Sequence, residues 1–277
     1  MGLPIKANFN AVIKSIRSDF ETYASLVHTE RWQGMDISKK PEMATMELLN
    51  HSFSMMIGTN NLLALAESIE PNLPWANDHF LERVGGQPLN PGKEWANWPY
   101  AASADRFRTN EQFTHSYMER YWPKEAGYTP GGVLEQTPDG LYPYHAGIRY
   151  QYGDLGDVVN QLDREPFTRQ AILPVWFPED TGVVHGGRVP CSIAYHFIRR
   201  GNALHVVYYL RSCDFIRHFR DDVYLTIRLM LWILEQLQAR SHSRWGEVIP
   251  GIYTMHMTSL HIFRNDYRAL GFKERQL

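Results

Sequence analysis

The sequence contains only two cysteines in 277 residues, Cys191 and Cys213. Two cysteines do not support a disulfide scaffold, so a reducing compartment such as the cytoplasm is expected. No apolar run reaches the roughly 18 residues of a membrane-spanning helix, and no apolar core follows the first residues as in a secretory signal. Lysine and arginine form no run and the formal net charge is −2, which argues against nonspecific nucleic-acid binding but not against a small anionic ligand.

What the sequence does contain is enough apolar material for a sizeable core. Hydrophobic residues make up 44% of the chain, and 277 residues fall within the range of a single domain with a mixed sheet. Strand-like and helix-like segments alternate, with hairpins among them. This pattern predicts one α/β or α+β domain over residues 1–277, in which helices flank a large mixed β-sheet.

The periodicity of apolar residues predicts the main elements. Helices are expected at 5–26, 62–69, 109–122, 154–163, 223–237 and 262–270, and strands at 43–57, 169–176, 192–199, 203–210 and 252–260. Thr109 is the expected cap of the 109–122 helix, with Gln112 as its capping-box partner. Residues 85–108, 178–187 and 241–247 are expected to be loops.

The stretch from Val189 to Val223 carries the chemistry. A thiol at Cys191, a guanidinium and hydroxyl at Arg211 and Ser212, and a carboxylate pair at Asp221 and Asp222 follow one another near expected strand ends. Loops and strand ends commonly hold binding and catalytic residues. Alone, however, Cys191 would more often be a buried structural cysteine.

Several motifs in this region resemble the thymidylate synthase superfamily, and within it the phage deoxycytidylate hydroxymethylases. Residues 140–267 carry most of the resemblance, whereas residues 58–108 look like an insertion. The matching segments are Val189-Pro190-Cys191, Arg211-Ser212-Cys213-Asp214, Phe219-Arg220-Asp221-Asp222, Ser259-Leu260-His261-Ile262-Phe263, Thr168-Arg169-Gln170 and, more weakly, Met118-Glu119-Arg120-Tyr121-Trp122.

The resemblance implies a thymidylate synthase-like fold and a one-carbon transferase that acts on a pyrimidine nucleoside monophosphate. The implied cofactor is 5,10-methylenetetrahydrofolate, and no metal is implied. The implied assembly is a homodimer in which Arg169 of one subunit reaches the phosphate site of the other. The implied product is 5-hydroxymethyl-dCMP.

Each matching residue then acquires an expected role. Cys191 would be the nucleophile that adds to carbon 6 of the pyrimidine ring. Arg211 and Ser212 would bind the substrate phosphate through charge-assisted hydrogen bonds, and Asp214 and His261 would also contact the substrate. Glu119 would organise water and move protons, although it could equally be a surface glutamate of its helix.

Asp222 would identify the base. A carboxylate accepts a hydrogen bond from the amino group of cytosine, whereas it would oppose the carbonyl oxygen of uracil. Asp221 is the competing candidate for this role, and an acidic pair at a helix start is common for electrostatic reasons alone.

Three departures from the family pattern leave alternatives open. Gln170 replaces an arginine, Phe263 replaces a tyrosine, and Ser192 stands where thymidylate synthases have a histidine. The alternatives are a dCMP methyltransferase, a CMP hydroxymethylase, an enzyme acting on dUMP, and an inactive nucleotide-binding relative.

Overall fold

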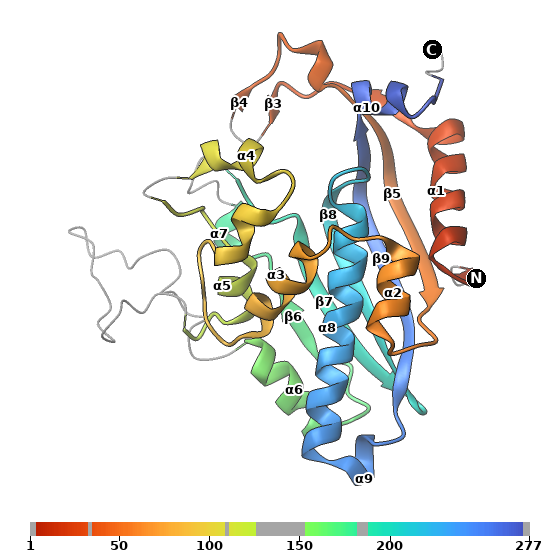
Figure 1. Cartoon of the computed structure of the whole chain (residues 1–277), viewed down its shortest axis with the longest axis vertical. Coiled ribbons are helices and arrows are strands. Elements are labelled where there is room, and N and C mark those ends of the chain that lie inside the picture. Colours follow the sequence, from red (N-terminus) through yellow and green to blue (C-terminus); the bar gives the residue numbers. More distant parts are fainter. Residues whose placement is uncertain (1–3, 33–34, 109–110, 126–152, 182–187, 274–277) are drawn as a thin grey trace, which may run out of the picture.

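The computed structural model describes residues 4–32, 35–108, 111–125, 153–181 and 188–273 (Figure 1). Within these ranges the chain forms a seven-stranded mixed sheet of order β1-β5-β9-β8-β7-β6, with β2 paired to β5. Helices flank this sheet, which confirms the expected fold class. A separate two-stranded sheet pairs β3 (Arg31–Trp32) with β4 (Met35–Asp36).

The strands of the large sheet are mostly long and alternate between buried and exposed residues, as a sheet with one covered face requires. β7 and β8 form an antiparallel hairpin, whereas β8 and β9 are parallel and are joined through two helices. The strands are β1 (Ile5–Lys6), β2 (Ser25–Val27), β5 (Thr45–Met56), β6 (Ile172–Pro174), β7 (Ser192–Arg200), β8 (Ala203–Asp214) and β9 (Ile249–Phe263).

The helices vary from single turns to one long central helix. They are α1 (Phe9–Tyr23), α2 (Leu62–Ile69), α3 (Trp75–Val84), α4 (Ala101–Ala104), α5 (Tyr117–Tyr121), α6 (Leu155–Arg164), α7 (Pro178–Thr181), α8 (Phe219–Arg240), α9 (His242–Trp245) and α10 (Arg264–Ala269). Short 3-10 turns occur at η1 (Pro41–Met43), η2 (Lys93–Asn97) and η3 (Asp105–Phe107). Within the described ranges, no helix combines the length and the apolar character needed to cross a membrane.

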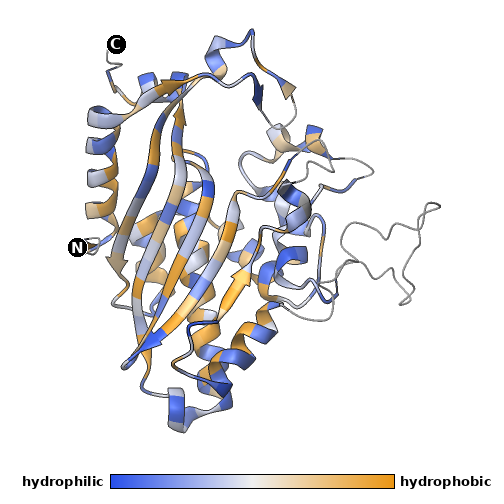
Figure 2. Cartoon of the chain, turned by 180° about the vertical axis from the view of Figure 1, so that it is seen from behind, coloured by the Kyte–Doolittle hydropathy of each residue, from blue (hydrophilic) through white to orange (hydrophobic). Residues whose placement is uncertain are grey.

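The core lies between the sheet and the helices on one of its faces. α8 is apolar nearly all round and buries residues along its whole length, as its sequence predicted. Viewed from behind, the strands stand in front of the helices, and no helix of the described residues crosses the opposite face of the sheet (Figure 2). That uncovered face carries half-exposed residues of β7, β8 and β9, among them His196, Val207 and His256.

Three strands of the large sheet, β5, β7 and β8, are irregular at about the same level. Asn50 of β5 has a positive φ of 53°, and Ser192 and Ala194 of β7 flank a shift in register with β8. On β8 the consecutive residues Arg211 and Ser212 are both half-exposed. An irregularity of this kind changes the direction in which side chains point, so Arg211 and Ser212 can face the same site.

The N-terminal half departs most from the sequence-based prediction. The expected helix 5–26 is a short strand followed by α1, because the Asn8 side chain caps that helix by accepting from Ala11 N at 2.9 Å. The expected 85–108 loop contains η2, α4 and η3 and follows α3, which was not predicted. Aromatic packing explains its order, since Trp98 stacks on His218 and contacts Trp75.

The predicted helix 109–122 was wrong in its start and its cap. The helix is α5 and begins at Tyr117, with Ser116 as N-cap and Glu119 completing a capping box. Thr109 lies outside the described residues. The expected loop 241–247 contains α9, and the expected strand 169–176 is paired only over Ile172–Pro174. The 178–187 segment begins with α7, and its residues 182–187 lie outside the described part.

Candidate active site

Cys191 lies directly before β7, in a loop held by Arg211. The backbone N–H of Arg211 donates to the Cys191 carbonyl at 2.9 Å. Its Nε donates to the Pro190 carbonyl at 2.7 Å, and its Nη2 donates to the Val189 carbonyl at 3.1 Å. Arg211 therefore fixes the loop that presents the thiol, in addition to the phosphate role expected for its remaining N–H groups.

The environment of the Cys191 thiol is electrostatically mixed. Burial raises the pKa of Cys191, and the charges of Asp222 and Asp214 add to this effect, whereas Arg211 and Arg188 oppose it. These groups come from β8, from α8 and from the segment just before Cys191. The structure thus brings the predicted thiol, guanidinium and carboxylates into one electrostatic neighbourhood, although the chain separates them by up to about thirty residues.

The two candidate carboxylates of α8 have different surroundings. Asp221 accepts from the backbone N–H of Asn72 at 2.8 Å and from its side-chain Nδ2 at 2.7 Å. Asp222 instead lies beside Cys213, whose Sγ donates to its Oδ2 at 3.7 Å. Burial raises the pKa of Asp222 to about 7, against the lowering effect of Arg83. Asp221 therefore has a structural partner, and Asp222 is the carboxylate whose charge acts on Cys191.

Glu119 is buried on α5 and is held from two sides. Its Oε2 accepts from Ser116 N at 2.8 Å and from Asn90 Nδ2 at 2.9 Å. Burial raises the pKa of Glu119 to about 7, and the hydrogen bonds from Asn90 and Ser116 limit the increase. The surface-glutamate alternative is wrong, because only 7% of this residue is exposed.

Asp214 and His261 are neighbours across β8 and β9, with their Cα atoms in register. Oδ1 of Asp214 accepts from the backbone N–H of Arg217 at 3.0 Å, and Oδ2 pairs with the Arg217 guanidinium at 2.8 Å. Although burial would raise the pKa of Asp214, Arg217 and the nearby His218 and His261 hold it below its usual value. Asp214 thus organises the turn before α8, and its substrate contact stays a prediction.

Ser212 and His261 lie on the strands that border this turn. Ser212 is half-exposed and pairs with Ser259 of β9, whose hydroxyl donates to Glu47 of β5. Burial lowers the pKa of His261, so its imidazole is neutral near pH 7. A neutral ring can donate from one nitrogen and accept at the other, which suits a sugar hydroxyl.

Arg169 is not brought into this group within one chain. It is exposed, and its carbonyl accepts from His196 Nε2 at 3.1 Å. Gln170 beside it is exposed as well. Because the His196 side chain lies on the uncovered face of the sheet, Arg169 lies near the rim of that face.

Sequence reasoning missed a chain of hydroxyl groups beside the thiol. Ser192 Oγ lies 2.9 Å from the Tyr117 hydroxyl, and it also hydrogen-bonds the Tyr208 hydroxyl. The Tyr208 ring stacks on Tyr195 at 4.4 Å. The sequence motifs do not single out these tyrosines. Only the polar Ser192 after Cys191 signalled that buried partners were needed.

Aromatic residues of the 58–108 segment extend the site beyond Asp214. Trp98 stacks on His218 with ring centroids 5.0 Å apart, and Tyr100 meets Trp98 edge-on at 5.3 Å. Trp98 Nε1 is buried and has no hydrogen-bond partner within the described part of the chain. Burial lowers the pKa of His218 to about 4, so this ring is also neutral. The described residues contain no cluster of three His, Cys, Asp or Glu side chains that could hold a metal ion.

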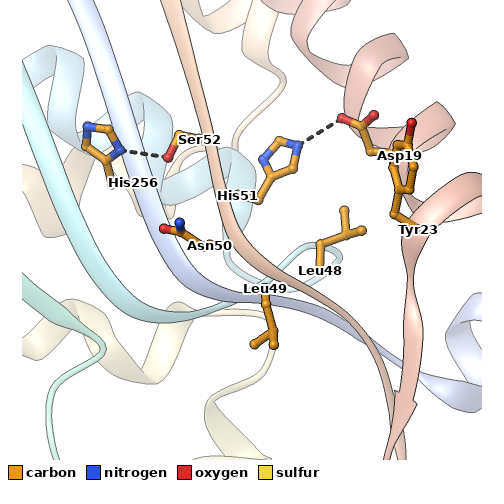
Figure 3. A pocket seen from close by; sticks show the side chains of 8 residues that line it. All are labelled: Asp19, Tyr23, Leu48, Leu49, Asn50, His51, Ser52 and His256. Atoms are coloured by element: carbon orange, nitrogen blue, oxygen red, sulfur yellow. Dashed lines mark hydrogen bonds and ion pairs between the residues drawn. The ribbon is translucent and has the colours of Figure 1, made fainter. Parts of the chain in front are cut away.

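A hollow of about 660 Å³ lies away from Cys191, between α1 and the irregular level of β5 (Figure 3). Asp19 and His51 form an ion-pair contact of 3.0 Å there, and Ser52 Oγ lies 2.7 Å from His256 Nδ1. None of the residues that line it belongs to the predicted site. The candidate site is therefore the group of residues around Cys191 rather than this hollow.

The family model for thymidylate synthase matches residues 87–271, which is more than half of the chain. The chain belongs to the thymidylate synthase family. The matched range contains every predicted site residue, from Glu119 to His261. It begins inside the 58–108 segment, and the reading of that whole segment as an insertion stays a prediction.

Similar proteins are known in Methanosarcina barkeri, Methanosarcina mazei and Methanococcoides burtonii, each named "Putative thymidylate synthase". They are 27%, 27% and 26% identical to this thymidylate synthase family member over 137 residues. The match covers 48% of this chain and 58% of each relative, so the chain spans less than two thirds of their length.

Proposed function

We propose that this protein is a deoxycytidylate 5-hydroxymethylase, which attaches a one-carbon unit to carbon 5 of dCMP and hydrates it. The observation that carries the proposal is the position of Asp222. Of the two neighbouring carboxylates of α8, Asp222 is the one whose charge acts on Cys191, whereas Asp221 is bonded to Asn72. A carboxyl group there accepts from an amino group, which cytosine has and uracil lacks.

Cys191 would begin the reaction by adding to carbon 6 of the ring. The new carbon–sulfur bond draws its electron pair from the thiolate, and the displaced ring electrons make carbon 5 nucleophilic. Arg211 and Arg188 favour the thiolate that this step needs. When carbon 5 later loses its proton and the thiolate leaves carbon 6, the ring regains its double bond. Glu119, with a pKa of about 7, is suited to accept that proton.

The residues near Asp214 fit the proposed cofactor, 5,10-methylenetetrahydrofolate. A flat heterocycle needs an aromatic wall and hydrogen-bond donors, and Trp98, His218 and the unpartnered Trp98 Nε1 offer both. When bound, this cofactor supplies the one-carbon unit. Trp98 and His218 would orient it, and the neutral His218 ring would not repel a cationic group.

The hydroxyl chain favours hydration over methylation. Tyr117, Ser192 and Tyr208 form a polar line next to Cys191, where thymidylate synthases have a histidine after the cysteine. Hydroxyl groups donate and accept, so they can position a water molecule for addition to the new carbon. A dCMP methyltransferase would use the same residues and remains the second candidate.

A homodimer would complete the phosphate site. The uncovered face of the sheet offers a large surface for a second copy (Figure 2). Arg169 lies near the rim of that face, because its carbonyl accepts from His196. From there, Arg169 of one subunit would join Arg211 and Ser212 of the other. Arginine suits this role because its planar group binds phosphate oxygens in pairs.

The test of this proposal compares dCMP and dUMP as substrates of wild type, Asp222→Asn and Asp221→Asn. In Asp222→Asn the amide can donate to the uracil carbonyl, so the ratio of kcat/KM values should move toward dUMP by roughly 30- to 1000-fold. In Asp221→Asn the ratio should stay within about threefold of wild type. A shift in Asp221→Asn alone would transfer the base-reading role to Asp221.

A further inference from the structure

Arg120 of α5 and Asp180 of α7 form an ion pair that is removed from solvent. Neither side chain has exposed surface, and the two groups meet as a fork, with Nη1 3.0 Å from Oδ2 and Nη2 3.0 Å from Oδ1. The Arg120 guanidinium also lies over the Phe177 ring, with Cζ 4.2 Å from the ring centroid. Taking two charges out of water is costly, and apolar residues in their place are often equally stable. Stability alone is therefore a weak explanation for this buried pair.

The buried pair fixes the segment from Val175 to Asp180, which follows β6 and enters α7. Arg120 Nη1 donates to the Val175 carbonyl at 3.3 Å. Asp180 Oδ2 accepts from the Phe177 N–H at 2.8 Å, and the Asp180 N–H donates to the Phe177 carbonyl at 3.0 Å. A single guanidinium therefore holds both ends of this segment against α5.

The same segment contacts the start of β7, just after the expected nucleophile. The N–H groups of Val175 and Trp176 both donate to the Ile193 carbonyl, at 2.9 and 3.0 Å. Ile193 lies within the register shift of β7 and is two residues from Cys191. The Arg211 guanidinium, which holds the Cys191 loop, lies over the Trp176 ring with Cζ 5.7 Å from its centroid. The segment therefore supports both the strand and the loop that present the thiol.

α5 is thus attached to the start of β7 at two places. The Tyr117 hydroxyl contacts it directly, 2.9 Å from Ser192 Oγ. Arg120 reaches it indirectly, through the Val175–Asp180 segment. One contact would let the short helix pivot, whereas two contacts fix its orientation. Glu119 lies between Tyr117 and Arg120 on this helix, so the two contacts determine where its carboxylate stands relative to β7.

We propose that Arg120 is a positioning residue, which together with Asp180 holds Glu119 and Cys191 in the relative position that the reaction needs. The catalytic roles of Glu119 and Cys191 rest on the proposed function. A displacement of about 1 Å between reacting groups can slow a reaction by about 100-fold. Binding of dCMP should depend less on the buried pair, because Ser212 and Asp222 belong to β8 and α8.

The decisive variant is Arg120→Met/Asp180→Asn, which removes both charges. Methionine fills apolar space against Phe177, and asparagine keeps an oxygen that can accept from the Phe177 N–H. Arg120→Met alone leaves a buried carboxylate without its cation, so its urea midpoint should fall, and the double variant should recover much of that loss. The double variant therefore tests the proposal even if Arg120→Met does not fold.

In the double variant, kcat with dCMP should fall by roughly 10- to 100-fold, because Glu119 and Cys191 are less well aligned. The dissociation constant of dCMP, measured without the folate, should stay within about threefold of wild type. A pair that only stabilises the fold would leave kcat unchanged. Wild-type kcat in the folded double variant would therefore overturn the proposal.

Arg199→Met is the matched control. Arg199 is another buried arginine, 9% exposed, at the opposite end of β7 from Cys191. Its guanidinium lies over the Trp245 ring at 4.7 Å and donates to the Arg244 carbonyl at 2.8 Å. This variant should be less stable than wild type but keep its kcat. An equal fall of kcat in Arg199→Met would show that general loosening of β7 slows the reaction, and the role of Arg120 would be lost.

A second readout does not need turnover. The rate at which iodoacetamide alkylates Cys191, followed by mass spectrometry, reports how firmly the segment holds the thiol, and the buried Cys213 is the internal reference. Cys191 should react about threefold faster or more in the double variant, and at the wild-type rate in Arg199→Met. If wild type converts no nucleotide but this acceleration occurs, the proposed function fails and the positioning of Cys191 by Arg120 stands. Equal alkylation rates in wild type and the folded double variant would contradict that positioning.

Discussion

At the scale of single residues, Glu119 shows how a distant segment can prepare a family residue for catalysis. Its carboxylate is buried, which raises its pKa to about 7, and the side chain of Asn90 limits that increase by donating to Oε2. Asn90 is itself fixed, because its Nδ2 and Oδ1 also bond the carbonyl and the N–H of Phe113. Asn90 is therefore a positioning residue for Glu119.

Replacing Asn90 with alanine should raise the pKa of Glu119. The lost hydrogen bond stabilised the ionised form, and one such bond is worth about 1 kcal/mol or somewhat more, which corresponds to a shift of about one pH unit. If Glu119 acts as a base, the rising limb of the pH–rate profile should move to higher pH. The dCMP:dUMP ratio should not change.

Asn97→Ala is the control for this experiment, since Asn97 donates to Glu94 at the surface and touches neither carboxylate of the site. Its profile should overlay that of wild type. If the pH–rate profile of Asn90→Ala also matches that of wild type, the ionisation of Glu119 does not determine the rising limb of the profile.

Site residues that belong to a sequence motif could be predicted before the structure was known. The resemblance to family motifs made Cys191, Arg211 and Asp222 candidates, and the structure brings their charges together. It could not identify Asn90 or Tyr117. Their contacts with Glu119 and Ser192 join segments that are far apart in the chain, and no local sequence pattern reveals such contacts.

At the scale of helices and strands, the predictions differ from the structure mainly in where each element begins and ends. α2 and α6 were predicted within one residue, because both have a clear apolar face and a capping residue, Asn61 or Asp154. β8, β9 and α8 each extend past the predicted ends. Arg211, Ser212 and His261 therefore lie within paired strands, and Asp222 lies in the first turn of a helix, where backbone hydrogen bonds hold them.

The short α5 was mispredicted because two capping signals compete in the sequence. Thr109 with Gln112 and Ser116 with Glu119 both have the capping-box spacing. The capping box of Ser116 and Glu119 is the one that forms, because the Ser116 hydroxyl also donates to the Leu89 carbonyl and Glu119 accepts from Asn90. Tertiary contacts thus chose between two locally acceptable helix starts.

The junction between the 58–108 segment and α8 should contribute measurably to stability. Asp221→Ala removes the acceptor of two donors of Asn72, one of them a backbone N–H. Leaving buried donors unpaired should lower the free energy of unfolding by about 2–4 kcal/mol, which urea denaturation can measure. Glu94→Ala, which removes a surface acceptor, is the control and should change stability by less than about 0.5 kcal/mol. Asp221→Ala as stable as wild type would show that this junction is not important for folding.

At the scale of the whole molecule, one face of the sheet has no covering layer within the described part of a single chain. Tyr209 and Ile193 are exposed on β8 and β7, and Ile172 is exposed on β6. The sequence predicted the mixed sheet but gave no direct sign of which face would lack helices. That follows only from the order of strands and the side on which α8 crosses (Figure 1).

If the site is shared between two copies, inactive variants should complement each other. Arg169→Ala and Cys191→Ala should each have little activity, whereas each mixed dimer contains one site with neither defect. After subunit exchange, about one quarter of wild-type activity should return. Cys191→Ala mixed with Cys191→Ala/Arg169→Ala cannot form an intact site and should stay inactive. No recovery in the first mixture, once exchange is verified, would contradict a shared site.

The most direct test of one-carbon transfer to a cytosine nucleotide is to identify the product. The purified protein would be incubated with dCMP, dUMP or CMP and carbon-labelled 5,10-methylenetetrahydrofolate, and the nucleotides resolved by mass, with Cys191→Ser as the inactive control. We expect labelled 5-hydroxymethyl-dCMP from dCMP, much less product from CMP and dUMP, and none from Cys191→Ser. Labelled thymidylate from dUMP as the main product, or equal product from Cys191→Ser, would contradict the proposed function.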